Sequence, residues 1–363
     1  MENKAIQMSE AQWVAWFKEQ GENRFRAKQI FEWFYWKGEF NPDNFSNMSK
    51  DLREKLKTQF DWSVPTFDTV LSSEDESEKI LLKLSDNRLA ECVIMPSENR
   101  VTLCVSSQIG CKMACTFCQT GKMGFSRNLS TGEILMQITL ANKRLGDRKV
   151  TNVVFMGMGE PLDNYDEVVP ACKAMIDPKL FGLSKHKVTV STSGLIPEIN
   201  KLGQDVPVAL AISLHTADDA ERSKIMPVNR RYPLDELKKA LLNYPVQTRH
   251  GITFEYVMIQ GVNDSIAHAK KLVKFLHGLK AKVNLIPMNP HPGSPMVATD
   301  LAQMREFQKY LSDRSIPAPV RYSRGQDVSA ACGQLASKRK EEIDLPPRKV
   351  ALERRKEYLA TKK

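Results

Sequence analysis

Apolar residues recur at helical spacing in three stretches near the beginning of the chain. The stretches read MSEAQWVAWFKEQ, FRAKQIFEWFYWKG and MSKDLREKLKTQF, and Gly or Pro-Asp breaks separate them. An apolar residue at every third or fourth position places one face of a helix against a core. We therefore expect three helices between Ser9 and Phe60, within a helical N-terminal domain of residues 1–75.

Between Lys79 and Ser107 the apolar spacing shortens to near-alternation. The segment reads KILLKLSDNRLAECVIMPSENRVTLCVSS, with turn-forming residues at SDNR and SENR. Alternation places successive side chains on opposite faces of a strand, and the polar clusters provide turns. The pattern predicts two antiparallel hairpins, which form a β-hairpin extension over residues 76–108.

After Gly110 short apolar strands alternate with amphipathic helices. Helical stretches follow the strands TNVVFM, HKVTVST, VPVALAISL, ITFEYVMI and KVNLIPM, and PAPVRYS closes the series. Such alternation predicts an α/β fold with a parallel sheet covered by helices. We expect a partial (β/α) barrel over residues 109–337, because polar residues recur just after successive strands, where the loops of a barrel converge.

The composition is that of a soluble globular protein. Hydrophobic residues make up 42% and charged residues 26% of the 363 positions. No apolar run approaches the ~18 residues that a membrane helix needs. The polar start MENKAIQMSE lacks the apolar core of a secretory signal. These features predict a cytoplasmic protein that does not associate with membranes.

Half of the net charge of +10 lies at the C-terminal end. Residues 338–363 contain ten basic and five acidic side chains, which leaves a surplus of +5. A basic segment of this kind is either a tail that contacts phosphates or a solvated end of the chain. The sequence leaves both interpretations open.

Cys111, Cys115 and Cys118 form a C-x-x-x-C-x-x-C motif in GCKMACTFCQTG. Seven cysteines in a chain expected in the cytoplasm favour metal binding or thiol chemistry over disulfides. A structural zinc site takes four ligands, usually as two pairs, and no second pair of Cys or His follows. Three thiolates can instead bind three irons of a 4Fe-4S cube and leave the fourth iron open to another ligand.

Glycine and polar residues follow the predicted strands where their loops would meet. GMGEP, at residues 157–161, offers Gly159 for close backbone approach and Glu160 for an ammonium group. Each of the later residues taken alone is more often a capping or structural residue. Together they would surround one opening of the barrel. These later residues are Ser191, Ser213, His215 and Asn289.

The cysteine motif is the signature of the radical S-adenosylmethionine (radical SAM) superfamily, which the chain resembles from this point onward. The segments CKMACTFCQTG, VVFMGMGEPLDN, STSG, SLH and ACGQLAS occur in the order and spacing of the RlmN family. FRAKQIFEWFYW in the N-terminal domain is similar to that family too, so the resemblance covers nearly the whole chain. The resemblance implies methylation of carbon 2 of adenine in 23S rRNA, at the peptidyl transferase centre, and in tRNA, 3′ of the anticodon.

The resemblance also implies the cofactors and the residues that bind them. A 4Fe-4S cluster would be held by Cys111, Cys115 and Cys118, and two molecules of S-adenosylmethionine (SAM) would be used per turnover. One electron from the cluster would cleave SAM to a 5′-deoxyadenosyl radical. The residues implied to contact SAM are Gly159, Glu160, Ser191, Ser213, Leu214, His215 and Asn289.

Three further residues take roles by the same resemblance. Cys332, in ACGQLAS, would accept a methyl group and then carry it to the base as part of a covalent protein–RNA intermediate. Cys104 would resolve that intermediate by forming a disulfide with Cys332, and Glu91 would accept the ring proton. Without the resemblance, the sequence around Glu91 predicts a solvent-facing strand residue.

The implied partners are 23S rRNA, tRNA and a reductase such as flavodoxin or ferredoxin, and the chain is expected to be a monomer. Arg24, Arg26 and Lys28 alternate with aromatic residues that form either an RNA surface or the core of the N-terminal domain. One alternative is a Cfr-type enzyme that methylates carbon 8 of adenine. We favour carbon 2 because GMGEP retains Pro161 and the N-terminal domain is of the RlmN type. A second alternative, of a different class, is a non-catalytic RNA-binding protein whose cysteines hold a structural metal.

Overall fold

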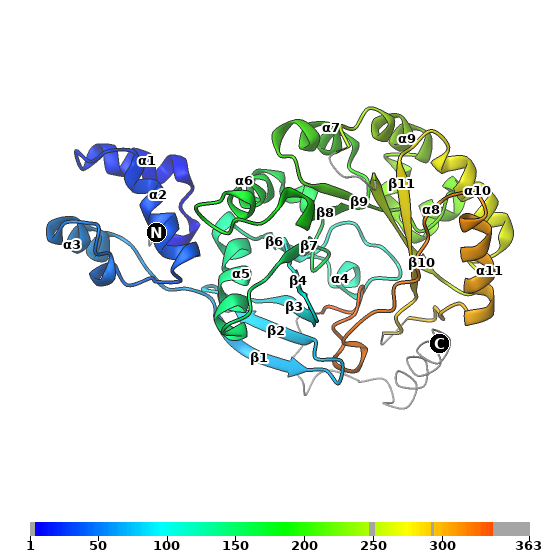
Figure 1. The fold of residues 1–363 in the computed structure, drawn as a ribbon, viewed down its shortest axis with the longest axis horizontal. Coiled ribbons are helices and arrows are strands. Elements are labelled where there is room, and N and C mark those ends of the chain that lie inside the picture. Colours follow the sequence, from blue (N-terminus) through cyan, green and yellow to red (C-terminus); the bar gives the residue numbers. More distant parts are fainter. Residues whose placement is uncertain (1–3, 247–250, 292–293, 337–363) are drawn as a thin grey trace.

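The computed structural model describes residues 4–246, 251–291 and 294–336. A helical N-terminal region stands beside a larger α/β body (Figure 1). The basic tail predicted over residues 338–363 lies outside the described residues. None of the helices in the described part of the chain is long and apolar enough to cross a membrane.

The N-terminal region contains the three predicted helices. Side chains of Ser9 and Ser49 cap the first and the third helix. Trp13, Phe17 and Phe34 are buried, so most of the aromatic residues form the core of this region, while Trp36 remains 63% exposed. The elements are η1 (Ala5–Gln7), α1 (Glu10–Glu19), α2 (Phe25–Phe31), its π-helical continuation η2 (Glu32–Trp36), η3 (Pro42–Asn44) and α3 (Lys50–Gln59).

The predicted hairpins form one antiparallel meander at the edge of a nine-stranded sheet. The sheet begins with β1 (Thr66–Ser72), which pairs with β2 (Glu78–Lys83), and continues through β3 (Leu89–Ser97) and β4 (Arg100–Cys104). The sequence pattern predicted that residues 66–72 belong to the helical domain, but in the structure they form strand β1 of the sheet. Strand β1 escaped sequence detection because most of its residues are partly or fully exposed, so its apolar pattern is weak.

From β4 onward the sheet is parallel, which confirms the partial barrel. Its strands follow one another in space as they do in sequence: β7 (Asn152–Phe155), β8 (Val188–Thr192), β9 (Ala209–Ser213), β10 (Ile252–Met258) and β11 (Ala281–Pro287). The barrel stays open because β1 and β11 are the two edges of the sheet. Beyond β11, Val320 forms only an isolated parallel bridge with Leu285.

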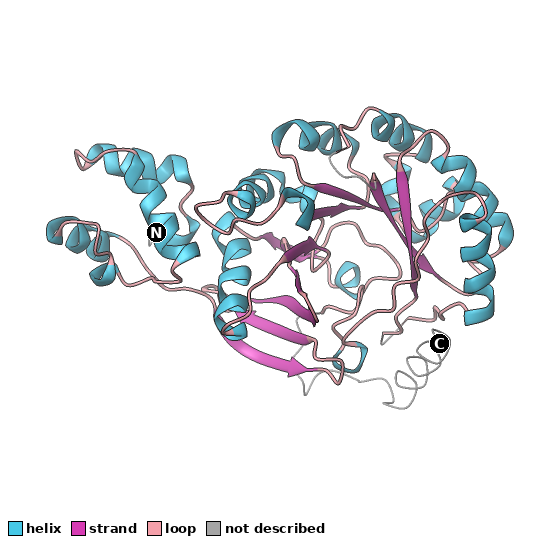
Figure 2. Cartoon of the chain, in the orientation of Figure 1, coloured by secondary structure: helices cyan, strands magenta, loops and turns pink. Residues whose placement is uncertain are grey.

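Helices cover the outer face of this sheet, and the inner face surrounds the barrel interior (Figure 2). The main hydrophobic core lies between the helices and the sheet. One smaller cluster joins β3 and β4 to the C-terminal segment, and another lies at the ends of β10 and β11. The helices are α5 (Thr131–Leu145), α6 (Tyr165–Ile176), α7 (Ile196–Asp205), α8 (Asp219–Ile225), α9 (Leu234–Leu242), α10 (Ile266–Leu276) and α11 (Leu301–Ser312). Short 3-10 turns are η4 (Pro161–Asn164), η5 (Lys185–Lys187), η6 (Pro227–Arg230) and η7 (Gln326–Val328).

The sequence analysis missed one small ribbon beside the barrel. It consists of β5 (Gln108–Gly110), the short helix α4 (Gln119–Lys122) and β6 (Phe125–Asn128), and β5 and β6 pair with each other. These elements are too short to show a hydrophobic period. The ribbon matters because the three motif cysteines lie between β5 and α4.

Candidate active site

One cavity in the barrel interior gathers most of the predicted site residues. It encloses about 900 Å³ of empty space, part of which is open to solvent. The strand-end loops of the barrel contribute its walls, as the alternation of strands and helices predicted. The predicted residues that line it are Cys111, Cys115, Cys118, Gly159, Glu160, Ser191, Ser213, His215, Asn289 and Cys332.

Backbone contacts fix the shape of the cysteine loop. Gly110 has a φ of +73°, and a Cβ atom there would lie 1.8 Å from the carbonyl oxygen of Gly124. The loop therefore depends on a glycine at its entrance. The amide of Cys111 donates to the same oxygen over 2.9 Å, and the amide of Cys118 donates to the Cys115 carbonyl over 3.1 Å. These contacts hold the three thiols along one wall of the cavity.

The donor set of this loop fits a cube better than a single ion. The Cys111, Cys115 and Cys118 thiols influence one another electrostatically. A structural zinc ion takes four ligands, and this loop offers three thiols. A cube binds its cysteines at separate irons, so its ligands stand farther apart than those of one ion. Burial raises the pKa of Cys111 to about 12, so metal binding has to release the thiol proton.

The GMGEP loop places a buried carboxylate at the cavity wall. Gly159 has a φ of +101°, and a Cβ atom there would lie 2.6 Å from the Cβ atom of Gln108. The Glu160 carboxylate accepts hydrogen bonds from the amides of Ser193, over 2.7 Å, and Leu162, over 3.1 Å. Burial raises the pKa of Glu160, and the Ser193 amide opposes that shift. The loop thus presents a positioned acceptor for an ammonium group.

The residues at the carboxyl ends of β8 and β9 reach the cavity in different ways. Ser191 and Ser213 line it, but the side chain of Leu214 packs in the main hydrophobic core. The Leu214 amide donates a hydrogen bond to the Glu255 carbonyl over 3.0 Å. Because the side chain of Leu214 packs in the core, it does not line the cavity. The prediction of a SAM contact at Leu214 is therefore limited to its backbone.

His215 is neutral and has a fixed tautomer. Its Nδ1 accepts a hydrogen bond from the Val257 amide over 3.0 Å, so the proton lies on Nε2. Burial, and then the nearby Arg222, lower the pKa of His215 to about 3. Its ring meets Phe117 of the cysteine loop edge to face, with the ring centroids 4.7 Å apart. His215 can therefore offer a single N–H donor to a ligand in the cavity.

Asn289 joins the barrel to the C-terminal segment that carries Cys332. Its Nδ2 donates to the Cys332 carbonyl over 3.0 Å and to Ser323 Oγ over 2.8 Å. The amide of Gln119 donates to the carbonyl of Gly333 over 2.7 Å, which ties this segment to the cysteine loop as well. Two contacts from different parts of the barrel thus place Cys332 at the cavity.

Cys332 is accessible, and its accessible surface faces the cavity interior. Protein surrounds the thiol there, and this burial together with Glu255 raises the pKa of Cys332 to about 11. Cys104, at the end of β4, is buried, and burial followed by the proximity of Cys332 raises its pKa. The structure therefore brings the two predicted cysteines close together.

Glu91 is buried, so the solvent-facing position that the sequence alone predicts is wrong. On β3 it shares a face with Val93, which packs against the Cys104 side chain in a small cluster with the C-terminal segment. Its carboxylate forms a 3.0 Å ion pair with Lys79, and Lys79 Nζ donates to the Ser329 carbonyl over 3.3 Å. Glu91 is not among the residues that line the cavity, and its pair with Lys79 joins it to the segment that carries Cys332.

Sequence reasoning missed three charged residues of the barrel interior. Lys79 and Arg222 are buried, and Glu255 lines the cavity beside the predicted residues. A signal was present for Glu255, because a carboxylate inside the apolar strand ITFEYVMI has to lie buried in a parallel sheet. Burial raises the pKa of Glu255 to about 7, and Asn284, which donates to its Oε1 over 2.8 Å, opposes that shift.

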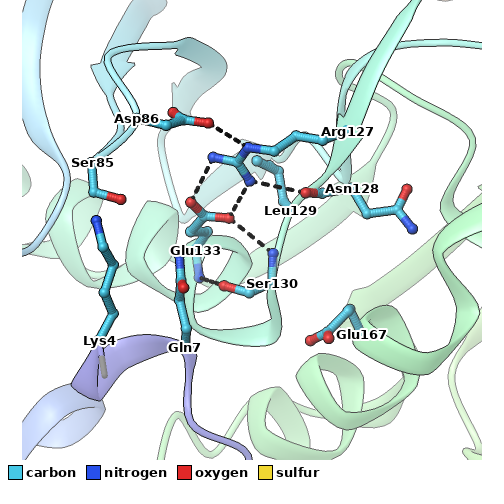
Figure 3. Close-up of a pocket in the computed structure, with 10 residues that line it drawn as sticks. All are labelled: Lys4, Gln7, Ser85, Asp86, Arg127, Asn128, Leu129, Ser130, Glu133 and Glu167. Atoms are coloured by element: carbon cyan, nitrogen blue, oxygen red, sulfur yellow. Dashed lines mark hydrogen bonds and ion pairs between the residues drawn. The ribbon is translucent and has the colours of Figure 1, made fainter. Parts of the chain in front are cut away.

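A second pocket lies where the N-terminal segment meets α5 (Figure 3). Arg127 occupies its centre and pairs with Asp86 over 2.6 Å and with Glu133 over 2.8 Å. Glu133 is only 2% exposed and also accepts from the Ser130 amide. The charges of Arg127, Asp86 and Glu133 are therefore paired with one another. We interpret this network as structural, because it connects the hairpin turn, β6 and α5.

The fold and the cysteine loop define a radical SAM protein. The family model described as "Radical SAM superfamily" matches residues 105–274. The crystal structure of a radical SAM methyltransferase from Sphaerobacter thermophilus is 40% identical, with a TM-score of 0.86, and the match covers 93% of this chain and 100% of that one. Such proteins use a 4Fe-4S cluster and SAM.

Comparison with characterised relatives identifies the family. The model described as "Ribosomal RNA large subunit methyltransferase N-terminal domain" matches residues 5–61. The dual-specificity RNA methyltransferase RlmN of Geotalea uraniireducens is 47% identical over 88% of this chain and 93% of that protein. The protein of the same name from Nitratiruptor is 45% identical over 87% and 93%. The chain belongs to the RlmN family of radical SAM RNA methyltransferases, which excludes the non-catalytic alternative.

Proposed function

We propose that this chain methylates carbon 2 of adenine in 23S rRNA and in tRNA. The dual-specificity name of its relatives and the match of its N-terminal region to a ribosomal RNA methyltransferase domain support these substrates. The family name favours carbon 2 over the carbon 8 of the Cfr-type alternative. The observation that carries the proposal is the cavity itself, which brings the cysteine loop and Cys332 together.

The residues of the cavity divide into two groups by what they bind. Cys111, Cys115 and Cys118 would hold the cluster through their thiolates. Once bound, the cluster and SAM supply the 5′-deoxyadenosyl radical. Among the SAM-contact residues, Glu160 would accept a hydrogen bond from the ammonium group of SAM, and His215 would donate from Nε2.

Cys332 is the methyl carrier in this proposal. Its sulfur would attack the methyl carbon of one SAM, forming a thioether as the sulfonium bond breaks. A thiol whose pKa is raised to about 11 reacts slowly until a cation lies nearby, and the sulfonium group of SAM would be such a cation. Because Cys332 faces the cavity, the methyl group would then stand where an adenine base enters it.

Release of the product assigns roles to Glu91 and Cys104. Product release would start from an adduct in which the methylene carbon on Cys332 is bonded to carbon 2 of adenine. This adduct would give up one electron to the oxidised cluster and its ring proton to Glu91. Cys104, as a thiolate, would then attack the sulfur of Cys332, so that a disulfide forms, the carbon–sulfur bond breaks, and the released carbon takes up a proton to become the methyl group. The electrostatic influence of Cys332 on Cys104 supports their proximity. Lys79 supports an ionised Glu91, because it supplies the opposite charge that a buried carboxylate requires. Reduction of the disulfide completes the cycle.

Several further properties belong to the same proposal. A reductase such as flavodoxin or ferredoxin would supply electrons, the enzyme would act as a monomer in the cytoplasm, and residues 1–75 would form an RNA-binding unit. Arg24 and Lys28 lie on α2 or at its start, and the ring of Trp36 at the end of η2 is exposed. A base has to leave its stack to enter the cavity, and a neighbouring RNA surface would hold the unfolded strand.

The test is anaerobic purification followed by iron and sulfide analysis, and then methylation of transcribed rRNA and tRNA fragments. Mass analysis of the nucleosides should show 2-methyladenosine in both substrates. Formation of 8-methyladenosine would instead establish the Cfr-type activity. A Cys115→Ala variant is the matched control, and it should lose both iron and methylation.

A further inference from the structure

Arg222 is a fully buried cation without an acidic partner. It lies in α8, has no exposed surface, and forms no ion pair with Asp or Glu in the part of the chain that the structure describes. Burial lowers the pKa of Arg222 to about 10, and the charges of Cys115 and then Asp219 oppose that shift. An unpaired charge in a protein interior is costly unless another charge compensates it.

The guanidinium group is held by neutral oxygen atoms. Its Nη2 donates to the carbonyls of Ser193, over 2.7 Å, and Ser213, over 3.0 Å, and its Nε donates to the Leu214 carbonyl over 3.1 Å. The Asn229 side chain accepts from Nη1 over 2.8 Å. One side chain therefore holds together the carboxyl ends of β8 and β9, where the predicted SAM contacts Ser191, Ser213 and His215 lie.

The helix of Arg222 is also attached to the cysteine loop. The amide of Thr116, between the second and third motif cysteines, donates to the carbonyl of Ile225 over 3.0 Å. Among the charged groups that act on Arg222, Cys115 attracts it most strongly. Helix α8 thus connects the cysteine loop to the ends of β8 and β9, and the guanidinium binds Ser193 and Ser213, which line the same cavity as the three thiols.

We propose that Arg222 is a positioning residue and the built-in counter-charge of the cysteine loop. Three thiolates bring negative charge into the barrel, and the buried guanidinium compensates part of it. A fixed cation near a cluster stabilises its reduced, more negative state, because net charge is one of the factors that set cluster potentials. The inference rests on the proposed binding of the cluster by Cys111, Cys115 and Cys118.

Two substitutions separate the charge of Arg222 from its hydrogen bonds. Arg222→Gln removes the charge and retains donors, and Arg222→Lys retains the charge and loses the planar fork. Arg230→Gln is the matched control, because Arg230 lies exposed in the same segment. The readouts are iron content, the midpoint potential of the cluster from an electron paramagnetic resonance titration, and the melting temperature of the iron-free protein.

Arg222→Gln should make the cluster harder to reduce, with a midpoint potential below that of the wild type, and Arg222→Lys should shift it less. Arg230→Gln should leave the potential unchanged. An iron-loaded Arg222→Gln protein with the wild-type potential would overturn the proposal, whatever its melting temperature. If Arg222→Gln does not retain iron, Arg222→Lys decides: iron retained by the lysine variant shows that the loop requires the positive charge, and iron lost from both variants overturns the proposal, because the hydrogen-bonding fork and not the charge is then what the loop requires. Failure of the cysteine assignment is distinct, because the wild type would then bind no iron or Cys115→Ala would keep it.

Discussion

Lys79 Nζ lies 3.0 Å from Glu91 Oε1, and the two side chains are 1% and 0% exposed. The pair joins neighbouring strands β2 and β3, and Lys79 also contacts the carbonyl of Ser329, three residues before Cys332. A buried ion pair is costly to disrupt, because removal of one partner leaves the other charge in a poorly solvated site. The pair therefore links the stability of the sheet to the placement of Cys332.

The first prediction concerns this pair. Lys79→Met should lower the free energy of unfolding by about 3–5 kcal/mol, because it removes the ammonium group from a buried carboxylate. Chemical denaturation measures the change. The exposed pair Lys309–Asp313 provides the control, and Lys309→Met should cost at most about 0.5 kcal/mol. Equal costs for the two substitutions would show that the buried pair does not form in solution.

The second prediction concerns the methyl carrier. Cys332→Ala should bind iron like the wild type and form no methylated RNA, because no thiolate remains to accept the first methyl group. Iron analysis and nucleoside mass analysis measure the two effects. Cys172→Ala is the control, since this buried core cysteine has no role in the proposal and the variant should methylate RNA. Methylated RNA from Cys332→Ala would disprove the assignment.

The third prediction separates Cys104 from Cys332. In the proposed mechanism, the Cys104→Ala variant would still carry the methyl group on Cys332 to adenine but would lack the thiol that releases the product. A protein–RNA crosslink should therefore accumulate, visible on denaturing gels with labelled RNA and traceable by mass analysis to the peptide containing Cys332. Full turnover by the Cys104→Ala variant would show that another group resolves the intermediate.

The fourth prediction is a pH dependence that originates in Glu255. Burial raises the pKa of Glu255 from 4.5 to about 7, so the folded state binds its proton more tightly than the unfolded state. This contribution to stability is complete below about pH 4.5 and is lost as the pH rises to about 7. At pH 8, Glu255→Gln should be more stable than the wild type by about 3 kcal/mol, and the difference should vanish near pH 4.5. Denaturation curves across this range, with the exposed Glu306→Gln as control, test it.

The fifth prediction concerns the basic tail, which lies outside the described residues. Deletion after Ser337 removes a surplus of +5 and should weaken RNA binding and flatten its salt dependence, because tail contacts to phosphates release counterions. The methylation chemistry at saturating RNA should change little. Identical binding by the full chain and the truncated chain across a salt series would show that the segment is only a solvated end.

The spacing of apolar residues along the sequence was enough to predict the helices and strands, because these elements depend on residues close together in the chain. The helical and alternating periods predicted the three N-terminal helices, the hairpins and the parallel strands, because periodicity records which face of an element is buried. Cys111, Cys115 and Cys118 predicted a shared site because they lie within eight residues, and a loop of that length keeps their side chains close together. Residues just after strands were predicted to converge, and Glu160 and Ser191 do line one cavity.

Tertiary structure alone decided the contacts between distant segments. The sequence could not show that Glu91 is buried against Lys79, that Cys104 approaches Cys332, or that Arg222 holds two strand-end loops. These contacts depend on the register between strands and on the path of the C-terminal segment across the barrel, which no local period encodes. Tertiary structure also decided the direction of the Leu214 side chain, which packs in the main hydrophobic core and does not line the cavity.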